Sequence, residues 1–131
     1  MSLASNYTKN TDCLVIIFDV APSKIGPNST EAEQEAHLDT VTKKWLRLFE
    51  ENNKDDCFLV LVGNKIDVRP RTISHRVASN KAKKMNVDYF EVSAKTGENI
   101  DKLFNSLIDR YEQSRVEKTF KTHSSRYKLM T

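Results

Sequence analysis

Glycine is scarce in this chain of 131 residues, which contains only Gly26, Gly63 and Gly97. A P-loop holds phosphate groups on consecutive backbone N–H groups and follows the pattern Gly-x-x-x-x-Gly-Lys-Ser/Thr. The three glycines lie too far apart to form that pattern. The sequence between Met1 and Thr131 therefore excludes this type of phosphate-binding loop.

Strong net charge, long apolar runs and metal-ligand clusters are also missing. The net charge of +3 is too small to indicate nucleic acid as a partner. No run of about 18 apolar residues is present, and no apolar signal-peptide stretch follows Met1, so we expect a soluble, cytoplasmic protein. No histidine or second cysteine lies at ligand spacing from Cys13 or Cys57, so we expect no metal site.

Three apolar runs alternate with three segments of helical periodicity. Continuous apolar runs are typical of strands that are covered on both faces. The expected strands cover residues 13–20, 57–63 and 88–93. The expected helices cover residues 31–52, residues 73–85 and a segment that begins at residue 100. Thr30 and Glu33 predict a capping box at the start of the first helix.

The last helical segment carries the most regular apolar stripe in the sequence, and we expect this stripe to be core. Its members are Ile100, Leu103, Phe104, Leu107, Ile108 and Tyr111. The alternation of strands and helices predicts an α/β fold of three layers, with right-handed crossovers and a mostly parallel sheet that has helices on both faces. Ligands of such sheets bind beyond the carboxyl ends of the strands, where Asn64 and Ser93 fall.

Two polar segments follow apolar runs. Asn64-Lys65-Ile66-Asp67 follows residues 57–63, and Ser93-Ala94-Lys95 follows residues 88–92. With these motifs the chain resembles the Ras/Rab small GTPases over most of its length. The resemblance covers only the C-terminal portion of such a protein, because the P-loop and the switch regions are missing. It implies a partial small-GTPase P-loop NTPase fold over residues 1–113.

The resemblance implies that Asp67 recognises a guanine base. A fixed carboxylate accepts two hydrogen bonds side by side, and guanine offers an N1–H and an exocyclic amine in that geometry. Adenine has no N1 proton and would leave the carboxylate unpaired, and sites of this kind reject such analogues by ~10⁴–10⁵. Ser93, by the same resemblance, would hold Asp67 in place.

The resemblance also assigns roles to the neighbouring residues of the two segments. Asn64 would contact the imidazole edge of the base and tie the two segments together. Lys65 would lay its methylene stem on one face of the ring, and Lys95 would cover the other face. Ala94 would offer its backbone N–H to the guanine carbonyl. A different α/β domain with a coincidental motif would instead place the two segments far apart.

The resemblance implies GTP or GDP as the ligand, and Mg²⁺ only in a complete domain. The parent family hydrolyses GTP, but no residue here matches its water-positioning glutamine or switch threonine, so we expect no catalytic residue in this chain. A Rab-like small GTPase in membrane traffic or signalling, with protein effectors and regulators, is the leading hypothesis. The alternative is a pseudo-GTPase or a truncated protein-interaction module that does not bind nucleotide tightly.

Three further expectations concern the remaining segments. Residues 21–30 are rich in Pro, Gly, Asn and Ser and resemble an insertion in the domain, either a disordered excursion or a partner-binding loop. Residues 114–131 form a basic tail, either a frayed helix or disordered. The final residues contain no cysteine for prenylation, so we expect no lipid anchor, with the protein in the cytoplasm or at the periphery of membranes.

The strand over residues 13–20 lacks a neighbour that the resemblance implies, namely the strand preceding the P-loop. Residues 14–20 are apolar apart from Asp19, so the strand would present an apolar edge. Exposed edges of this kind pair with other chains. We therefore expect a fragment, a truncated gene model or splice form, or a chain that associates with itself through this edge.

Overall fold

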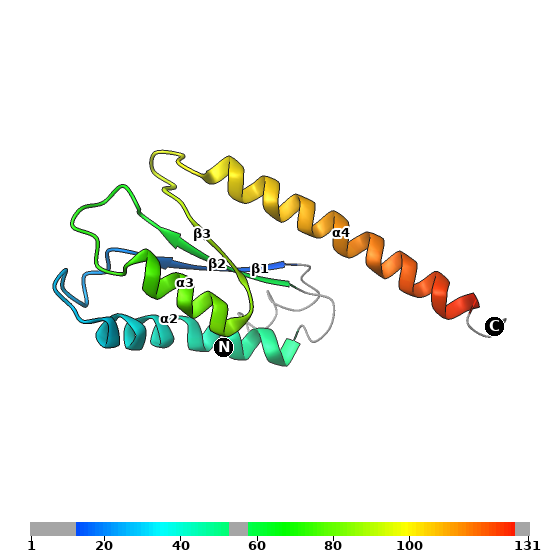
Figure 1. Cartoon of the computed structure of the whole chain (residues 1–131), viewed down its shortest axis with the longest axis horizontal. Helices are drawn as coiled ribbons and strands as arrows, with labels where there is room; N and C mark the ends of the chain where they lie inside the picture. Colours follow the sequence, from blue (N-terminus) through cyan, green and yellow to red (C-terminus); the bar gives the residue numbers. More distant parts are fainter. Residues whose placement is uncertain (1–12, 53–57, 128–131) are drawn as a thin grey trace.

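The computed structural model describes the backbone of residues 13–52 and 58–127, in which three strands and three helices alternate (Figure 1). The elements are β1 (Cys13–Asp19), α2 (Glu31–Asn52), β2 (Phe58–Asn64), α3 (His75–Met85), β3 (Asp88–Glu91) and α4 (Ile100–Tyr127). The predicted order of elements is confirmed. Among the described residues, no helix combines the length and apolar character needed to cross a membrane.

Local capping signals account for where α2 and α3 begin. The predicted capping box is present, since Glu33 N donates to Thr30 Oγ1 at 3.2 Å and Thr30 N donates to Glu33 Oε1 at 3.3 Å. The second helix begins at His75 rather than at residue 73. Ser74 caps it by accepting a hydrogen bond from Val77 N at 3.1 Å.

The three strands form one parallel sheet in the order β1-β2-β3. In the register of the sheet, Asp19 lies beside Asn64 and Gly63 lies beside Glu91, so the carboxyl ends of the strands meet at one edge. Figure 1 shows α2 and α3 on one face of the sheet and α4 on the other. This arrangement confirms the predicted three-layer α/β fold with helices on both faces.

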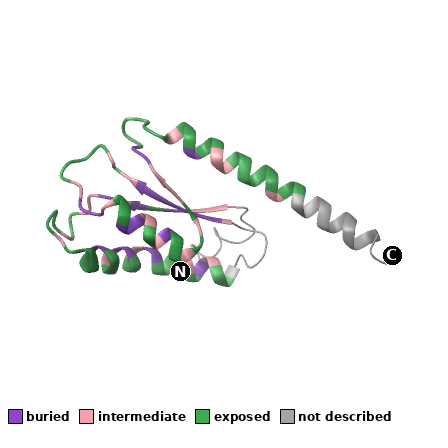
Figure 2. Cartoon of the chain, in the orientation of Figure 1, coloured by how far each residue is buried: buried purple, intermediate pink, exposed green. Residues whose placement is uncertain are grey.

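The two faces of the sheet carry cores of unequal size. Under α2 and α3, ten buried residues form one cluster, which includes Ile16, Leu38 and Leu61. Under α4 the buried cluster has four members, Val60, Val62, Val92 and Leu103. The helix α4 is accordingly exposed over most of the length whose side chains are described (Figure 2).

The prediction that the whole apolar stripe of α4 is core is wrong for half of its members. Leu103 is buried, and Ile100 and Leu107 pack against the smaller core. Phe104 and Ile108 are instead 55% and 53% exposed, and Tyr111 is also exposed. The stripe is wider than the strip of sheet below it, and no other described element covers the remainder.

The strand β1 is an edge strand within the described residues, where it pairs only with β2. Its apolar side chains are not exposed throughout. Ile16, Phe18 and Val20 are buried on the side of α2 and α3, whereas Ile17 points to the other face and is 63% exposed. The predicted apolar edge therefore consists of the backbone of β1 together with the side chain of Ile17.

Residues 21–30 connect β1 to α2 through turns without helix or strand. Ser29 N donates to Gly26 O at 3.2 Å, and Gln34 Nε2 donates to Ser29 O at 3.1 Å. Gln34 Oε1 also accepts from Ser74 N at 3.1 Å. One buried glutamine thereby fixes the end of this loop against the start of α3.

Candidate functional site

The two polar segments singled out in the sequence lie side by side at the carboxyl edge of the sheet. Asn64 is the last residue of β2, and Ser93 follows β3 after one residue. Val92 N donates to Gly63 O at 2.8 Å, and Ile66 N donates to Val92 O at 3.4 Å. Residues 64–67 and 93–95 therefore meet, and the alternative in which they lie far apart is excluded.

Ser93 holds the carboxylate of Asp67. The Ser93 side chain is buried, and its hydroxyl donates to Asp67 Oδ1 at 2.7 Å while accepting from Thr96 N at 3.1 Å. This hydrogen bond lowers the pKa of Asp67, and the positive charges of Lys95 and Arg69 lower it further. Asp67 is thus an oriented, ionised carboxylate at an exposed position of the sheet edge.

Asn64 connects the two segments through its side chain. Its Oδ1 accepts a hydrogen bond from Ala94 N at 3.0 Å. The Ala94 N–H, which the resemblance assigns to a ligand carbonyl, is thus already engaged. A ligand carbonyl at this N–H must share it with Asn64 or displace the asparagine.

Lys65 has a left-handed backbone, with φ of 71°, and its side chain reaches to the neighbouring strand. Its Nζ donates to Asp19 Oδ2 at 2.8 Å, and this hydrogen bond raises the pKa of Lys65. Asp19 Oδ1 also accepts from Ala21 N at 2.8 Å, so both carboxylate oxygens are engaged. The ion pair fixes the stem of Lys65 across the ends of β1 and β2.

No motif in the sequence indicated a role for Asp19. The signal was available, because Asp19 ends a strand that lies beside β2 in a parallel sheet, and strand ends of such sheets share one edge. Lys95 is exposed and lies near enough to Asp67 for its charge to act on that carboxylate. Every predicted site residue therefore lies at this edge, and Asp19 joins them.

The turn between Ser93 and α4 is shaped by hydrogen bonds to its own backbone. Gly97 N donates to Ser93 O at 2.8 Å, and Ser93 N donates to Glu98 O at 3.1 Å. Gly97 has φ of 85°, a conformation that residues with a Cβ rarely adopt. The turn therefore presents Ala94 and Lys95 on a defined loop.

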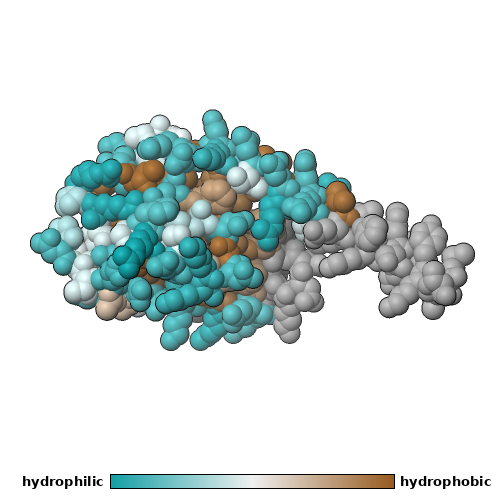
Figure 3. All heavy atoms as spheres, in the orientation of Figure 1, coloured by the Kyte–Doolittle hydropathy of each residue, from teal (hydrophilic) through white to brown (hydrophobic). Residues whose placement is uncertain are grey.

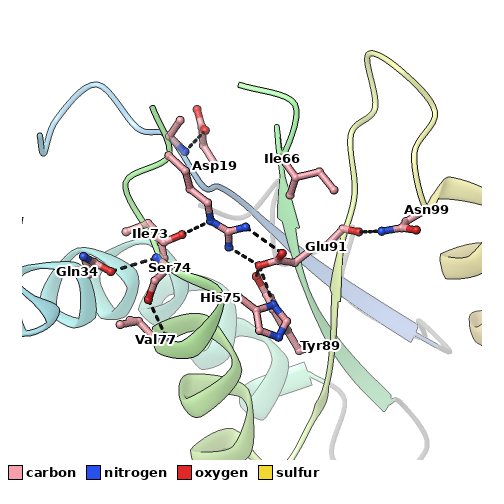
Figure 4. Close-up of polar contacts among 12 residues, drawn as sticks. Asp19, Gln34, Ile66, Ile73, Ser74, His75, Val77, Tyr89, Glu91 and Asn99 are labelled. Atoms are coloured by element: carbon pink, nitrogen blue, oxygen red, sulfur yellow. Dashed lines mark hydrogen bonds and ion pairs between the residues drawn. The ribbon is translucent and has the colours of Figure 1, made fainter. Parts of the chain in front are cut away.

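A polar cluster gathers around Glu91, the last residue of β3 (Figure 4). Arg71 Nη1 donates to Glu91 Oε1 at 2.9 Å, and Arg71 Nη2 donates to Glu91 Oε2. Arg71 Nε also donates to Ile73 O at 2.6 Å, while Tyr89 OH donates to Glu91 Oε2 at 2.6 Å. His75 Nδ1 lies 3.2 Å from the same oxygen. We name Arg71, His75, Tyr89 and Glu91 the Glu91 cluster.

The Glu91 cluster ties the segment after Asp67 to the strand before Ser93. Burial on its own would raise the pKa of Glu91, but the hydrogen bonds from Arg71 and Tyr89 lower it overall. Burial raises the pKa of Tyr89, and the hydrogen bond to Glu91 raises it further. No sequence pattern indicates this cluster, since its members are separated along the chain and only the fold brings them together.

The substitution Ser93→Ala tests the link between Ser93 and Asp67. Without the hydroxyl donor, the pKa of Asp67 is expected to rise toward its ordinary value, because the main interaction that favours the charged form is removed. NMR titration of the Asp67 side-chain carboxyl carbon measures this pKa. The control is Thr96→Ala, which leaves the Ser93 donor in place, and an equal rise in both variants would contradict the assignment.

Comparison with known proteins shows which family the chain belongs to. The model of the Ras family matches residues 1–113. The GTP-binding protein ypt5 of Schizosaccharomyces pombe is 29% identical over 111 residues, which are 83% of this chain and 46% of the relative. The Ras-related protein Rab-26 of Bos taurus is 28% identical over 113 residues, 86% of this chain and 39% of the relative.

A third relative, the circularly permutated Ras protein 1 of Dictyostelium discoideum, is 26% identical over 118 residues, which are 89% of this chain and 13% of that protein. The chain thus spans less than half the length of each of these three relatives. The match of the family model covers most of the chain and includes both polar segments of the sheet edge. The chain belongs to the Ras family, as a partial Ras/Rab-like small GTPase.

Proposed function

We propose that this chain recognises the guanine base of GTP or GDP at the carboxyl edge of its sheet. The observation that carries the proposal is the Asp67 carboxylate, which the buried Ser93 hydroxyl holds at 2.7 Å beside Asn64 and the 93–95 loop. An oriented carboxylate of this kind matches the paired N1–H and exocyclic amine of guanine. The residues proposed to bind the base are Asn64, Lys65, Asp67, Ser93, Ala94 and Lys95.

The ion pair of Lys65 with Asp19 supports the proposed role of Lys65. Its ammonium is engaged at 2.8 Å, so the methylene stem is held at the sheet edge, where an apolar stem can cover one face of a flat ring. Lys95, on the exposed loop of the second segment, would cover the other face. The two lysines then stack on the base while Asp67 reads its edge.

Base recognition alone predicts weak binding. Hydrogen bonds to a charged group contribute ~1.5–3 kcal/mol each, and stacking of a base adds ~1–3 kcal/mol. Association costs ~4–15 kcal/mol in lost freedom. The difference corresponds to a dissociation constant of about 1 mM or weaker. Because the sequence has no P-loop, we propose that phosphates and Mg²⁺ are held only in a complete domain and that this chain alone does not hydrolyse GTP.

The cellular role that we propose follows the relatives. The names of the compared proteins, a GTP-binding protein and a Ras-related Rab protein, support a Rab-like small GTPase, and we propose that it acts in membrane traffic or signalling. Protein effectors and regulators are then its partners, and the cytoplasm or the periphery of membranes its location. Residues 1–113 form the domain in this proposal, with residues 21–30 as an inserted loop and residues 114–131 as a basic tail.

The substitution Asp67→Asn tests base recognition directly. Millimolar GDP is expected to shift the NMR signals of residues 64–67 and 93–95, whereas ADP is not. In Asp67→Asn the affinity for GDP is expected to fall and that for xanthosine diphosphate to rise, because an amide can donate to the xanthine carbonyl. Titrations of both proteins with the three nucleotides measure the change in preference.

The matched control is Asp101→Asn, an exposed aspartate in the first turn of α4. It removes the same charge and is expected to leave the preference for GDP unchanged. An unchanged preference in Asp67→Asn would reject the role of Asp67. Micromolar binding of GDP by the unmodified chain would reject the argument from the missing phosphate loop.

A second candidate function is protein interaction without tight nucleotide binding. The specific observation in its favour is the incompletely covered face of the sheet, where Ile17 of β1 and Phe104 of α4 are each more than half exposed. Exposed apolar surface of this kind often marks a site of protein interaction. The two candidate functions use different surfaces and are compatible.

A further inference from the structure

Two carboxylates lie near a single lysine at the sheet edge. Lys65 Nζ donates to Asp19 Oδ2 at 2.8 Å, and this hydrogen bond is the main cause that raises the pKa of Lys65. The negative charge of Asp67 raises the same pKa by a smaller amount, so Asp67 also lies near the ammonium. Val68 N donates to Lys65 O at 3.0 Å, which closes a turn that holds Lys65 and Asp67 together. The ammonium therefore has two acids near it and pairs with Asp19.

An ion pair on this surface is not by itself evidence of a function. The surface of the described residues is mostly hydrophilic in the view of Figure 3, and exposed ion pairs contribute little to stability. Lys81 Nζ and Asp39 Oδ1, for example, form a similar pair at 2.6 Å between α3 and α2. The pair of Lys65 has a further feature, because the second carboxylate near this lysine is Asp67, the residue proposed to read the base.

The Asp19 carboxylate is fixed by the backbone at the end of its own strand (Figure 4). Its Oδ1 accepts a hydrogen bond from Ala21 N at 2.8 Å. The residue between them is buried and held on both sides, since Val20 N donates to Asn64 O at 3.0 Å and Val20 O accepts from Ile73 N at 2.8 Å. The sheet register places Asp19 beside Asn64, which directly precedes the lysine. The ammonium thus meets an acceptor whose position does not depend on the lysine.

Asp67 can bind a base only if its free acceptor positions stay open. An ionised carboxylate offers about four lone-pair positions on its two oxygens. The Ser93 hydroxyl occupies one of them, on Oδ1, at 2.7 Å, and the proposed contact with guanine needs two more. An ammonium bound to Asp67 would take one of the remaining positions and neutralise the charge that strengthens the hydrogen bonds to the base. The lysine stem is flexible, so Lys65 can turn from one carboxylate to the other.

We propose that Asp19 is a positioning residue of the guanine site, which holds the Lys65 ammonium at the end of β1 and so keeps the Asp67 carboxylate open for the base. This role rests on the proposed function for its ligand, whereas the choice of the lysine between two acids is a property of the free protein. The two carboxylates then have separate roles, since one pairs with a cation of the chain itself and the other pairs with the ligand.

The substitution Asp19→Asn tests this role without a nucleotide. The amide oxygen can still accept from Ala21 N, so the strand end is kept, but the charge that holds the ammonium is lost. Lys65 is then expected to turn to Asp67 and to lower the pKa of Asp67 below its value in the unmodified protein, because a positive charge beside a carboxylate favours its ionised form. NMR titration of the Asp67 side-chain carboxyl carbon measures this change.

A double-mutant cycle with Lys65→Met separates the effect of the lysine from the direct effect of the Asp19 charge. In the Lys65→Met background, Asp19→Asn removes only a like charge near Asp67, so the fall in the pKa of Asp67 is expected to be smaller than in the presence of the lysine. The charges of Lys95 and Arg69 act on Asp67 in all four proteins alike. General loosening of the sheet edge predicts a rise instead, because the hydrogen bond that lowers this pKa would weaken. A rise, no change, or equal falls in both backgrounds would overturn the proposal.

The affinity for GDP gives the second readout. In Asp19→Asn the dissociation constant for GDP is expected to rise about two- to fivefold, because the base must displace an exposed ion pair of Lys65 with Asp67. NMR titration with GDP measures the constant, and circular dichroism verifies that the variant is folded. The matched control is Asp39→Asn, which breaks the exposed pair with Lys81 and is expected to change neither the pKa of Asp67 nor the affinity for GDP.

The two measurements distinguish failure of this role from failure of base recognition. If the unmodified chain does not respond to GDP, base recognition is rejected, and the pKa of Asp67 in the free variants still decides which acid holds the lysine. If the unmodified chain binds GDP, and Asp19→Asn lowers the pKa of Asp67 without weakening that binding, base recognition stands and the role of Asp19 is rejected. Equal effects of Asp39→Asn and Asp19→Asn would reject it as well.

Discussion

Gly63→Ala is expected to lower the free energy of unfolding by about 1–3 kcal/mol, or more, because the site has no room for a methyl group. A Cβ at this position would lie 2.6 Å from the hydroxyl oxygen of Tyr89, 2.9 Å from Cγ1 of Val20 and 3.1 Å from Cζ of Phe18. Tyr89 cannot retreat easily, since its hydroxyl donates to Glu91 at 2.6 Å. The added carbon must therefore push these three side chains aside or break this hydrogen bond.

Urea denaturation followed by circular dichroism measures the effect. Gly26→Ala is the matched control, because a Cβ at Gly26 would meet no heavy atom within 4 Å. That substitution is expected to be neutral or to stabilise the protein slightly, because alanine lowers the conformational entropy of the unfolded chain. Equal stability of Gly63→Ala and Gly26→Ala would contradict the packing described around β2.

Arg71→Ala is expected to destabilise the protein by about 3 kcal/mol, because it leaves a largely buried carboxylate without its main counter-charge. The side chains of Arg71 and Glu91 are 22% and 15% exposed. Tyr89 and His75 still contact Glu91 in the variant and retain part of its stabilisation, so the loss is expected near the lower end for buried pairs. Urea denaturation of the variant at neutral pH measures the loss.

The pH dependence of stability separates the charge effect from lost packing. The folded protein lowers the pKa of Glu91, so this group stabilises the native state above its ordinary pKa, and the stabilisation is lost as the pH falls through the lowered value. Arg71→Ala is expected to weaken that acid-induced loss. The control is Arg76→Ala, which removes an exposed pair with Glu31 and is expected to cost no more than ~1 kcal/mol at any pH. An unaltered acid response in Arg71→Ala would contradict the role of this ion pair.

Much of this fold could be predicted because its elements carry strong local signals. Apolar runs, of which the first two are continuous, marked the three strands, and the pair Thr30 and Glu33 marked the start of α2. The meeting of residues 64–67 with residues 93–95 followed from topology, because parallel strands place their carboxyl ends at one edge. These features depend on neighbours in sequence or on a general rule of chain direction.

The features that could not be predicted depend on specific tertiary partners. Periodicity indicates that Phe104 and Ile108 share a face of α4 with Leu103, but it does not indicate how much of that face another element covers. Likewise, the sequence around Arg71 is typical of a plain turn. Its partner Glu91 lies on β3, and only the packed structure shows that the two side chains meet.

The inequality of the two cores has a dynamic consequence. Ten buried residues form the core on the side of α2 and α3. In contrast, the described part of α4 packs on the sheet only through Leu103 and a few half-buried neighbours. Partial unfolding therefore takes least free energy when α4 detaches and the remaining layers stay native. The turn that bears Ala94 and Lys95 is continuous with that helix and is expected to fluctuate with it. The Ser93 hydroxyl that holds Asp67 lies at the start of the same turn, so detachment of α4 is expected to loosen the Asp67 carboxylate as well.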